Sequence, residues 1–198
     1  SDYEKICARL DGLVDMIELN ISCPNVKCGG MAFGIRPESV KEVTRVSKGA
    51  LKKTPLIVKL SPNVESIAVN ALAAQEGGAD AVSLVNTFTG MVIDIERRRP
   101  LIANNTGGVS GAGIMPIAVR MTHEVCSAVT VPVIGMGGIT CAEDALQFII
   151  AGASAVQVGT ANFTDTLAMP KIIAGLNAWL DGHGIGNINE LRGTLKLN

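Results

Sequence analysis

Residues 131–162, VPVIGMGGITCAEDALQFIIAGASAVQVGTAN, decide the fold class of this 198-residue chain. The two apolar runs in this stretch, residues 131–136 and 155–159, are typical of short strands that are buried on both faces. Between them, residues 142–151 have helical periodicity and end at Gly152, a residue type that commonly terminates helices. A strand, a helix and a second strand in this order predict two parallel strands joined by a right-handed crossover.

The same strand-and-helix unit recurs in the rest of the chain. Three more strands are predicted at residues 16–22, 56–61 and 81–87, and four more helices at residues 38–52, 64–76, 114–128 and 166–180. Five such units predict an α/β fold with a parallel sheet, either open and doubly wound or part of a closed (β/α)8 barrel. Residues 91–103 predict a hairpin-like insertion. We expect residues 1–198 to form one domain.

Composition narrows the class of protein. Hydrophobic residues make up 47% of the chain and charged residues 18%, which allows a substantial core and excludes intrinsic disorder. The 17 basic and 18 acidic residues leave a net charge of −1. The net charge therefore gives no electrostatic attraction of the whole molecule to nucleic acid or to anionic lipid. Every apolar run is broken well before the ~18 residues that span a bilayer, and no secretory signal is visible.

The cysteines indicate the redox setting. They are Cys7, Cys23, Cys28, Cys126 and Cys141, an odd set without a CxxC pair. This pattern argues against a disulfide framework and against a structural zinc site. We therefore expect a cytoplasmic protein without a metal centre.

The loops at the carboxyl ends of the strands carry the chemistry of such folds. The first of these loops contains Asn20, Cys23 and Asn25. Amide side chains both donate and accept hydrogen bonds, so they suit a flat heterocycle with carbonyl and N–H edges. A thiol can accept a proton where its thiolate is stabilised, although a lone cysteine is more often a small buried hydrophobe. Neither His123 nor His183 is predicted on a strand-end loop, so a Cys-His nucleophile pair has little support.

Lys59 is a charged residue inside an otherwise apolar predicted strand, on the opposite face from its apolar neighbours. In a barrel its ammonium would project into the mouth and stabilise negative charge that develops during a reaction. The alternative is a lysine whose head escapes to water at the end of the strand. Asn86 and Thr87 end the next strand and add an amide and a hydroxyl to the same edge.

Two glycine-bearing loops follow the last two predicted strands, GMGGI at residues 135–139 and VGTAN at residues 158–162. Glycine lets backbone N–H groups approach an anion without a Cβ in the way, and the last two strands carry the usual phosphate site of (β/α)8 barrels. The pair of loops therefore favours the barrel. No GxGxxG follows the first strand and no GxxxxGK[ST] occurs, so neither a Rossmann site nor a P-loop is predicted.

Six motifs, NISCPN, VKLSPN, VNTFTG, NNTGGVSG, GMGGI and VGTANF, resemble those of the class 1 dihydroorotate dehydrogenases in order and spacing. The VNTFTG strand end and the MVIDIERRRPLIANNTGG insertion are most similar to the B type, and the likeness covers nearly the whole chain. It implies a TIM barrel. Because a complete barrel takes about 250 residues, we expect about the last five βα units, in a chain that begins inside a longer catalytic subunit.

The resemblance implies an FMN enzyme that oxidises (S)-dihydroorotate to orotate in de novo pyrimidine synthesis. By this likeness Cys23 is the base that removes the C5 proton while a hydride passes from C6 to flavin N5. Lys59 would face the N1/C2 edge of the flavin. The substrate would be held by Asn20, Asn25, Asn86 and Thr87. The cofactor would also be bound by Asn20, Val85, Gly111, Gly137, Gly138, Gly159 and Thr160.

The B type also implies partners. Its catalytic subunits form a homodimer that joins an electron-transfer subunit in a heterotetramer and passes electrons to NAD. No cysteine spacing in this chain is typical of a cluster, so FAD and the iron–sulphur cluster would belong to the partner subunit. The units that precede this chain in the family carry a lysine and a substrate loop. We therefore expect residues 1–198 alone to form an open barrel segment with apolar edges that binds FMN weakly or not at all.

Other interpretations stay open. A dihydropyrimidine-dehydrogenase-like domain or a fumarate-using A-type enzyme would share the cysteine base and FMN. An inactive barrel fragment would have a structural or assembly role. A phosphosugar isomerase or aldolase would use the glycine loops for phosphate and Lys59 as a Schiff-base amine, but it leaves the amides unexplained.

Overall fold

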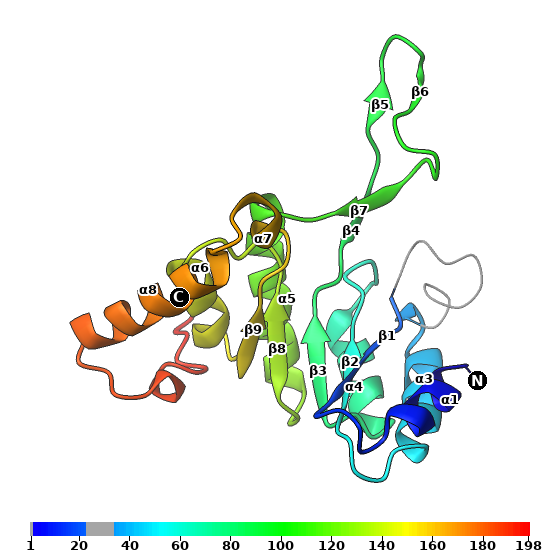
Figure 1. Ribbon diagram of the computed structural model, residues 1–198, viewed down its shortest axis with the longest axis horizontal. Helices are drawn as coiled ribbons and strands as arrows, with labels where there is room; N and C mark the ends of the chain where they lie inside the picture. Colours follow the sequence, from blue (N-terminus) through cyan, green and yellow to red (C-terminus); the bar gives the residue numbers. More distant parts are fainter. Residues whose placement is uncertain (1, 23–33) are drawn as a thin grey trace.

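The computed structural model describes residues 2–22 and 34–198, and its centre is a five-stranded parallel sheet (Figure 1). The strands are β1 (Ile17–Asn20), β2 (Leu56–Lys59), β3 (Ala81–Leu84), β8 (Val133–Met136) and β9 (Ala155–Gln157). They lie in the order β1-β2-β3-β8-β9, which is their order along the chain. A doubly wound sheet reverses its strand order at a switch point, so this sequential order is that of a barrel.

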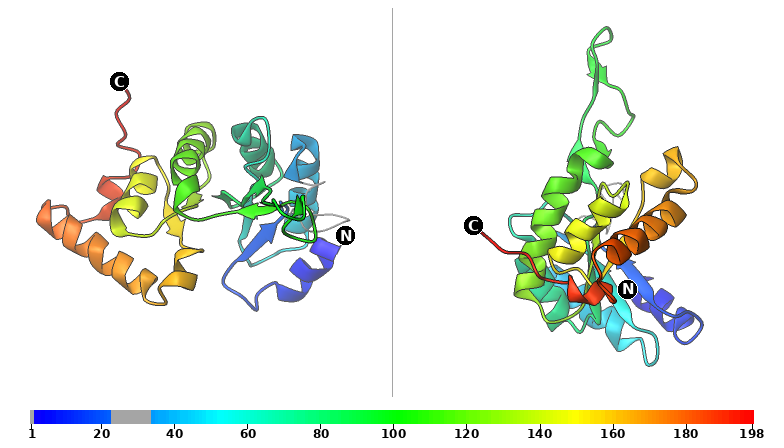
Figure 2. Two further views of the ribbon diagram at one scale, coloured as in Figure 1. Left: turned by 90° about the horizontal axis from the view of Figure 1, so that it is seen from above. Right: turned by 90° about the vertical axis from the view of Figure 1, so that its left-hand side faces the viewer.

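Among the described residues, one longer helix precedes the first strand, four lie between consecutive strands of the sheet, and one follows the last strand. They are α1 (Asp2–Leu10), α3 (Pro37–Gly49), α4 (Ile67–Glu76), α5 (Met115–Ala128), α6 (Ala142–Ile150) and α8 (Ala168–Gly182). Shorter turns of helix are η1 (Ala112–Ile114), α7 (Ala161–Thr164) and η2 (Ile188–Glu190). Seen from above, α3, α4, α5 and α6 stand in an arc outside the strands (Figure 2). The predicted alternation of strands and helices is confirmed.

Several helices begin where the sequence supplies a start signal. Pro37 opens α3, a position where its missing N–H costs nothing. The hydroxyl of Ser66 caps α4 by accepting from the N–H of Val69 at 3.4 Å. At the start of α6 the Asp144 carboxylate accepts from the N–H of Cys141 at 3.2 Å, as in a capping box. These caps fix the residue at which each helix begins, and therefore where the loop before it ends.

The two faces of the sheet differ in character. In β1 the buried side chains of Ile17 and Leu19 belong to the hydrophobic core that includes the helices. Side chains alternate along a strand, so Glu18 and Asn20 lie on the opposite face, which we call the inner face. Asn20 is in register with Lys59 of β2, and Lys59 is in register with Ser83 of β3. The inner face therefore carries polar and charged side chains, whereas the outer face is apolar.

The sheet is open among the residues that the structure describes. Within 2–22 and 34–198, β1 and β9 each have a strand neighbour on one side only. Five parallel strands in sequential order with helices on one side are part of a TIM barrel, in which eight strands form the ring. This agrees with the predicted architecture.

An antiparallel arm projects from the carboxyl end of β3 (Figure 1). β4 (Phe88–Gly90) pairs with β7 (Gly107–Val109), and further out β5 (Ile93–Asp94) pairs with β6 (Arg99–Pro100). The hairpin predicted at residues 91–103 is confirmed, and the paired β4 and β7 extend it toward the sheet. The arm returns the chain to η1 and α5 at the same edge as the end of β3.

Candidate functional site

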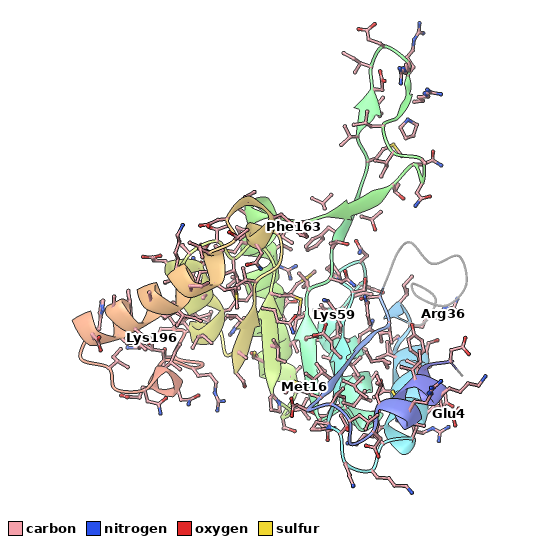
Figure 3. All side chains as sticks on the ribbon, viewed as in Figure 1. Glu4, Met16, Arg36, Lys59, Phe163 and Lys196 are labelled. Carbon is pink, nitrogen blue, oxygen red and sulfur yellow. The ribbon has the colours of Figure 1, made fainter. Side chains whose placement is uncertain are left out.

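A cavity of about 460 Å³ lies at the carboxyl ends of β2, β3, β8 and β9. Its volume is within the range of sites for small molecules and cofactors. Most of the residues singled out from the sequence line it: Lys59, Val85, Asn86, Thr87, Gly111, Gly137, Gly138, Gly159 and Thr160. Figure 3 shows Lys59 at the sheet and Phe163 near the base of the arm; Phe163 also lines the cavity and is 92% exposed.

Lys59 is held on the inner face by a carboxylate that the sequence analysis did not single out. Its Nζ lies 3.3 Å from Oε1 of Glu18, and the two side chains are 21% and 26% exposed. The other carboxylate oxygen of Glu18 accepts a hydrogen bond from Nε2 of Gln157 at 2.8 Å. The ammonium is thus partly shielded and paired at the wall of the cavity, so it does not simply escape to water.

Two of the predicted amides meet above the sheet. Nδ2 of Asn86 donates to Oδ1 of Asn20 at 3.1 Å and to Oγ of Ser22 at 2.7 Å. The N–H and hydroxyl of Ser22 both donate to the same Oδ1 of Asn20 at 3.2 Å. This network joins the ends of β1 and β3 over β2. Cys23 and Asn25, which follow Ser22, lie outside the described residues.

Asn63, in the loop after β2, fixes the chain around Thr87. Its Nδ2 donates to the carbonyl of Thr87 at 3.0 Å, and its Oδ1 accepts from the N–H of Thr89 at 3.0 Å. One side chain from the loop after β2 thereby holds both ends of the short segment after β3. The arm and the Thr87 hydroxyl are positioned from the same residue.

The two glycine loops form the opposite wall of the cavity. Gly137 and Gly138 have φ values of +128° and +82°, conformations that favour glycine. A Cβ on Gly138 would lie 2.9 Å from the carbonyl oxygen of Gly111, so the loop after β8 closely approaches the segment between the arm and η1. Oγ1 of Thr160 donates to Oγ of Ser110 at 2.8 Å, which ties the loop after β9 to the base of the arm.

Backbone donors in these loops remain available to a ligand. Among the described residues, no backbone carbonyl accepts a hydrogen bond from the N–H of Gly138 or of Gly159. A Cβ on Gly159 would meet nothing within 4 Å, so the approach to this loop is open. Two donor groups on adjacent strand ends, in a cavity that a lysine also lines, suit a ligand with an anionic group.

The cysteines within the described ranges are poor candidates for a reactive thiolate. Burial raises the pKa of Cys7, and it raises the pKa of Cys126 to about 11. Desolvation also raises the pKa of Cys141 at the start of α6. None of the three lines the cavity. The histidines are also elsewhere: Nδ1 of His123 is 3.4 Å from a backbone carbonyl, and the ring of His183 stacks on Trp179.

The described part of the chain lacks two features. None of its helices has the length and apolarity needed to cross a membrane. In the same residues no group of three or more His, Cys, Asp or Glu side chains is arranged to hold a metal ion.

Comparison with known proteins assigns the family. The family model described as dihydroorotate dehydrogenase matches residues 1–180. The chain belongs to the dihydroorotate dehydrogenase family. The resemblance drawn from the six motifs is thereby confirmed at the level of the family.

Curated relatives of this chain are named as the B type. It is 52% identical over 198 residues to a Bacteroides fragilis protein named "Dihydroorotate dehydrogenase B (NAD(+)), catalytic subunit", covering 99% of this chain and 65% of the relative. A Pelobacter propionicus protein of the same name is 51% identical over 197 residues, covering 98% of this chain and 64% of the relative. The chain therefore spans just under two thirds of the length of these relatives.

A solved structure supports the fold. The crystal structure of DHODH from Eimeria tenella in complex with ferulenol superposes with a TM-score of 0.82 at 23% identity. The match covers 98% of this chain and 57% of that chain. At this identity the likeness shows the fold alone, and it agrees with the barrel architecture described above.

Proposed function

We propose that this chain belongs to an enzyme that oxidises (S)-dihydroorotate to orotate during de novo pyrimidine synthesis. It provides the part of the active site that is built from the loops at the carboxyl ends of its strands. The observation that carries the proposal is the single cavity at the carboxyl ends of β2, β3, β8 and β9. It gathers a strand lysine, an amide, a hydroxyl and two glycine loops from four consecutive strands. Membership of the family supports the reaction class.

The residues of the cavity fit FMN, the cofactor of this family. A Cβ on Gly159 would meet nothing within 4 Å, so a phosphate can approach its N–H, whereas a Cβ on Gly138 would lie 2.8 Å from that of Met115 and would displace the loop. The N–H groups of Gly138 and Gly159 would bind the phosphate, with Gly137 and Thr160 beside them. Lys59 would lie at the N1/C2 edge of the ring system, with Val85 and Gly111 lining its plane. When bound, FMN supplies the acceptor for a hydride from substrate C6.

The amide network supports a site for the pyrimidine ring. Asn86 and Thr87 line the cavity, and Asn20 is hydrogen-bonded to Asn86. Amides held in fixed orientations can recognise the alternating carbonyl and N–H groups of dihydroorotate. We propose that Asn25 completes this set and that Cys23 removes the C5 proton. A thiol with a pKa of ~8.5 needs its thiolate stabilised or the substrate proton acidified to act at neutral pH.

The partners are part of the same proposal. The relatives are named NAD(+)-linked catalytic subunits, which supports an electron-transfer partner for this protein as well. We propose that the partner carries FAD and an iron–sulphur cluster and relays electrons to NAD, in a cytoplasmic heterotetramer built on a homodimer of catalytic subunits.

Oxidation of dihydroorotate by the complete protein tests this function. We expect FMN to copurify, orotate to form with NAD when the partner subunit is present, and Cys23→Ala to abolish orotate formation while FMN stays bound. Dihydrouracil in place of dihydroorotate, and fumarate in place of NAD with the partner subunit, serve as the controls that separate the related enzymes. Unchanged orotate formation by Cys23→Ala, or faster turnover with either control, would contradict the proposal.

A further inference from the structure

We propose that Glu18 is a positioning residue that holds the ammonium of Lys59 toward the cofactor edge and offsets part of its charge there, with Gln157 orienting Glu18. The inference rests on the proposed function, because it assumes that FMN occupies the cavity. It concerns two residues, Glu18 and Gln157, that have no place in the mechanism described above.

The sheet brings Glu18 and Lys59 together on one face. Glu18 of β1 is in register with Ile57 of β2, so Lys59 lies one inner-face position further along the neighbouring strand. Diagonal neighbours on one face of a sheet are within reach of long side chains. The Nζ to Oε1 distance of 3.3 Å shows that the two side chains use this reach.

Gln157 fixes the orientation of the Glu18 carboxylate relative to the lysine. Its Nε2 donates to Oε2 of Glu18 at 2.8 Å, and Oε1 is the oxygen next to Lys59. Gln157 belongs to β9, at the opposite edge of the open sheet from β1. The hydrogen bond therefore crosses the inner face and sets the carboxylate from the side opposite its own strand. Gln157 and Lys59 line the cavity, whereas Glu18 is not among the residues that line it.

The shielding of this ion pair distinguishes it from the other pairs recorded among the described residues. Both partners here are about three-quarters buried, whereas each of the other pairs has at least one side chain that is more than 40% exposed. Exposed pairs contribute little to stability, and shielded charges carry a desolvation cost that packing alone does not require. A charged pair at the wall of a ligand cavity is therefore more readily explained by its effect on the ligand.

The electrostatic consequence has a definite sign. An ammonium at the N1/C2 edge favours the reduced cofactor, which carries more negative charge there than the oxidised one. The carboxylate of Glu18 lies beyond the ammonium and weakens this preference without reversing it, because Coulomb energy falls with distance. Removing the charge of Glu18 should make reduced FMN bind relatively more tightly.

A redox titration of the FMN-loaded complete protein tests this. We expect Glu18→Gln to raise the affinity for reduced FMN over oxidised FMN roughly tenfold, which moves the two-electron midpoint potential by about 30 mV in the positive direction. Gln157→Leu keeps the negative charge of Glu18 but removes the hydrogen bond that orients its carboxylate. We therefore expect a smaller shift of the potential with the same sign. Lys59→Met should move the potential in the negative direction. Glu76→Gln, which breaks the exposed pair with Lys41, is the control expected to change nothing.

The outcomes separate this inference from the proposed function. If the unmodified protein fails to bind FMN, the proposed function is wrong, and the inference about Glu18 is wrong as well. If it binds FMN and Lys59→Met moves the potential while Glu18→Gln does not, Glu18 has no role in the charge at the cofactor. Should Glu18→Gln fail to fold, Gln157→Leu decides, because an unchanged potential in that variant overturns the proposal and a positive shift supports it.

Discussion

Nδ2 of Asn86 donates a hydrogen bond to Oδ1 of Asn20 at 3.1 Å, and this contact joins the carboxyl ends of β3 and β1 across the intervening strand. The two residues are far apart in sequence, yet the parallel register brings their strand ends to one edge of the sheet. The site is therefore built from the topology of the sheet, with each strand contributing one or two polar groups to a common rim.

Replacing Asn86 by Ala should impair substrate recognition. The variant loses an amide at the cavity and leaves Asn20 and Ser22 without their shared donor. We expect kcat/KM for dihydroorotate to fall by about 10- to 100-fold, or about 1.4–2.8 kcal/mol of transition-state stabilisation. Steady-state kinetics of the complete protein measure this. Asn177→Ala removes an exposed amide from α8 and should leave the kinetics unchanged; equal effects of both variants would contradict a role for Asn86.

Asn63→Ala should loosen the segment after β3. The side chain makes two hydrogen bonds to the backbone of Thr87 and Thr89, so its loss leaves a partly buried carbonyl and an N–H unpaired. We expect the free energy of unfolding to drop by about 1–3 kcal/mol and the KM for dihydroorotate to rise. Urea denaturation and initial-rate measurements test the two effects. A stability loss with an unchanged KM would show that Asn63 supports the fold without ordering the site.

Gly138→Ala should weaken cofactor binding. Gly138 has a φ of +82°, and its Cβ would lie 2.8 Å from that of Met115 and 2.9 Å from the carbonyl oxygen of Gly111. The strain and displacement of the loop should lower FMN affinity at least tenfold, which a fluorescence titration measures. Gly184 is the matched control, because its φ is +64° but a Cβ there meets nothing within 4 Å. Gly184→Ala should cost about 1–2 kcal/mol of stability with FMN affinity unchanged, and weakened FMN binding in both variants would contradict a local effect.

Asp11 makes folding stability depend on acid pH. Hydrogen bonds from the backbone N–H groups of Lys53, Thr54 and Lys52 lower the pKa of its carboxyl from 3.8 to about 2. Because the folded-state pKa is lower than the unfolded one, the stabilisation is complete above the unfolded value and is lost as the pH falls toward 2. We expect Asp11→Asn to be less stable at pH 7, with the difference shrinking between pH 4 and pH 2. Urea denaturation across this range tests it; a constant difference would exclude the titration of Asp11 as the cause.

The sequence predicted the fold well because its local signals agree with one another. Apolar runs, helix caps and glycine turns all mark the same five units, and the two glycine loops at residues 135–139 and 158–162 favoured the barrel. Strand ends were less well predicted, since the first strand covers Ile17–Asn20 and was expected over residues 16–22. Residues 21 and 22 lie beyond the end of the strand. Ser22 makes side-chain hydrogen bonds at the site and does not pair with the neighbouring strand.

Parts of the site that depend on distant contacts could not be predicted. Glu18 and Gln157 are 139 positions apart, and only the sheet topology brings them together. Each is a polar residue inside an apolar strand, the same signal that identified Lys59, so the pattern could have drawn attention to them without naming their partners. The strand pairing of Gly107–Val109 was also missed, because glycine carries no side chain that would indicate a strand.

The most direct test of the account is a crystal structure of the complete protein with FMN and orotate bound. We predict that the FMN phosphate accepts hydrogen bonds from the N–H groups of Gly138 and Gly159, that Lys59 lies at the N1/C2 edge, and that Sγ of Cys23 faces C5 of orotate. FMN bound away from the two glycine loops, or a Cys23 thiol directed away from the pyrimidine ring, would contradict it.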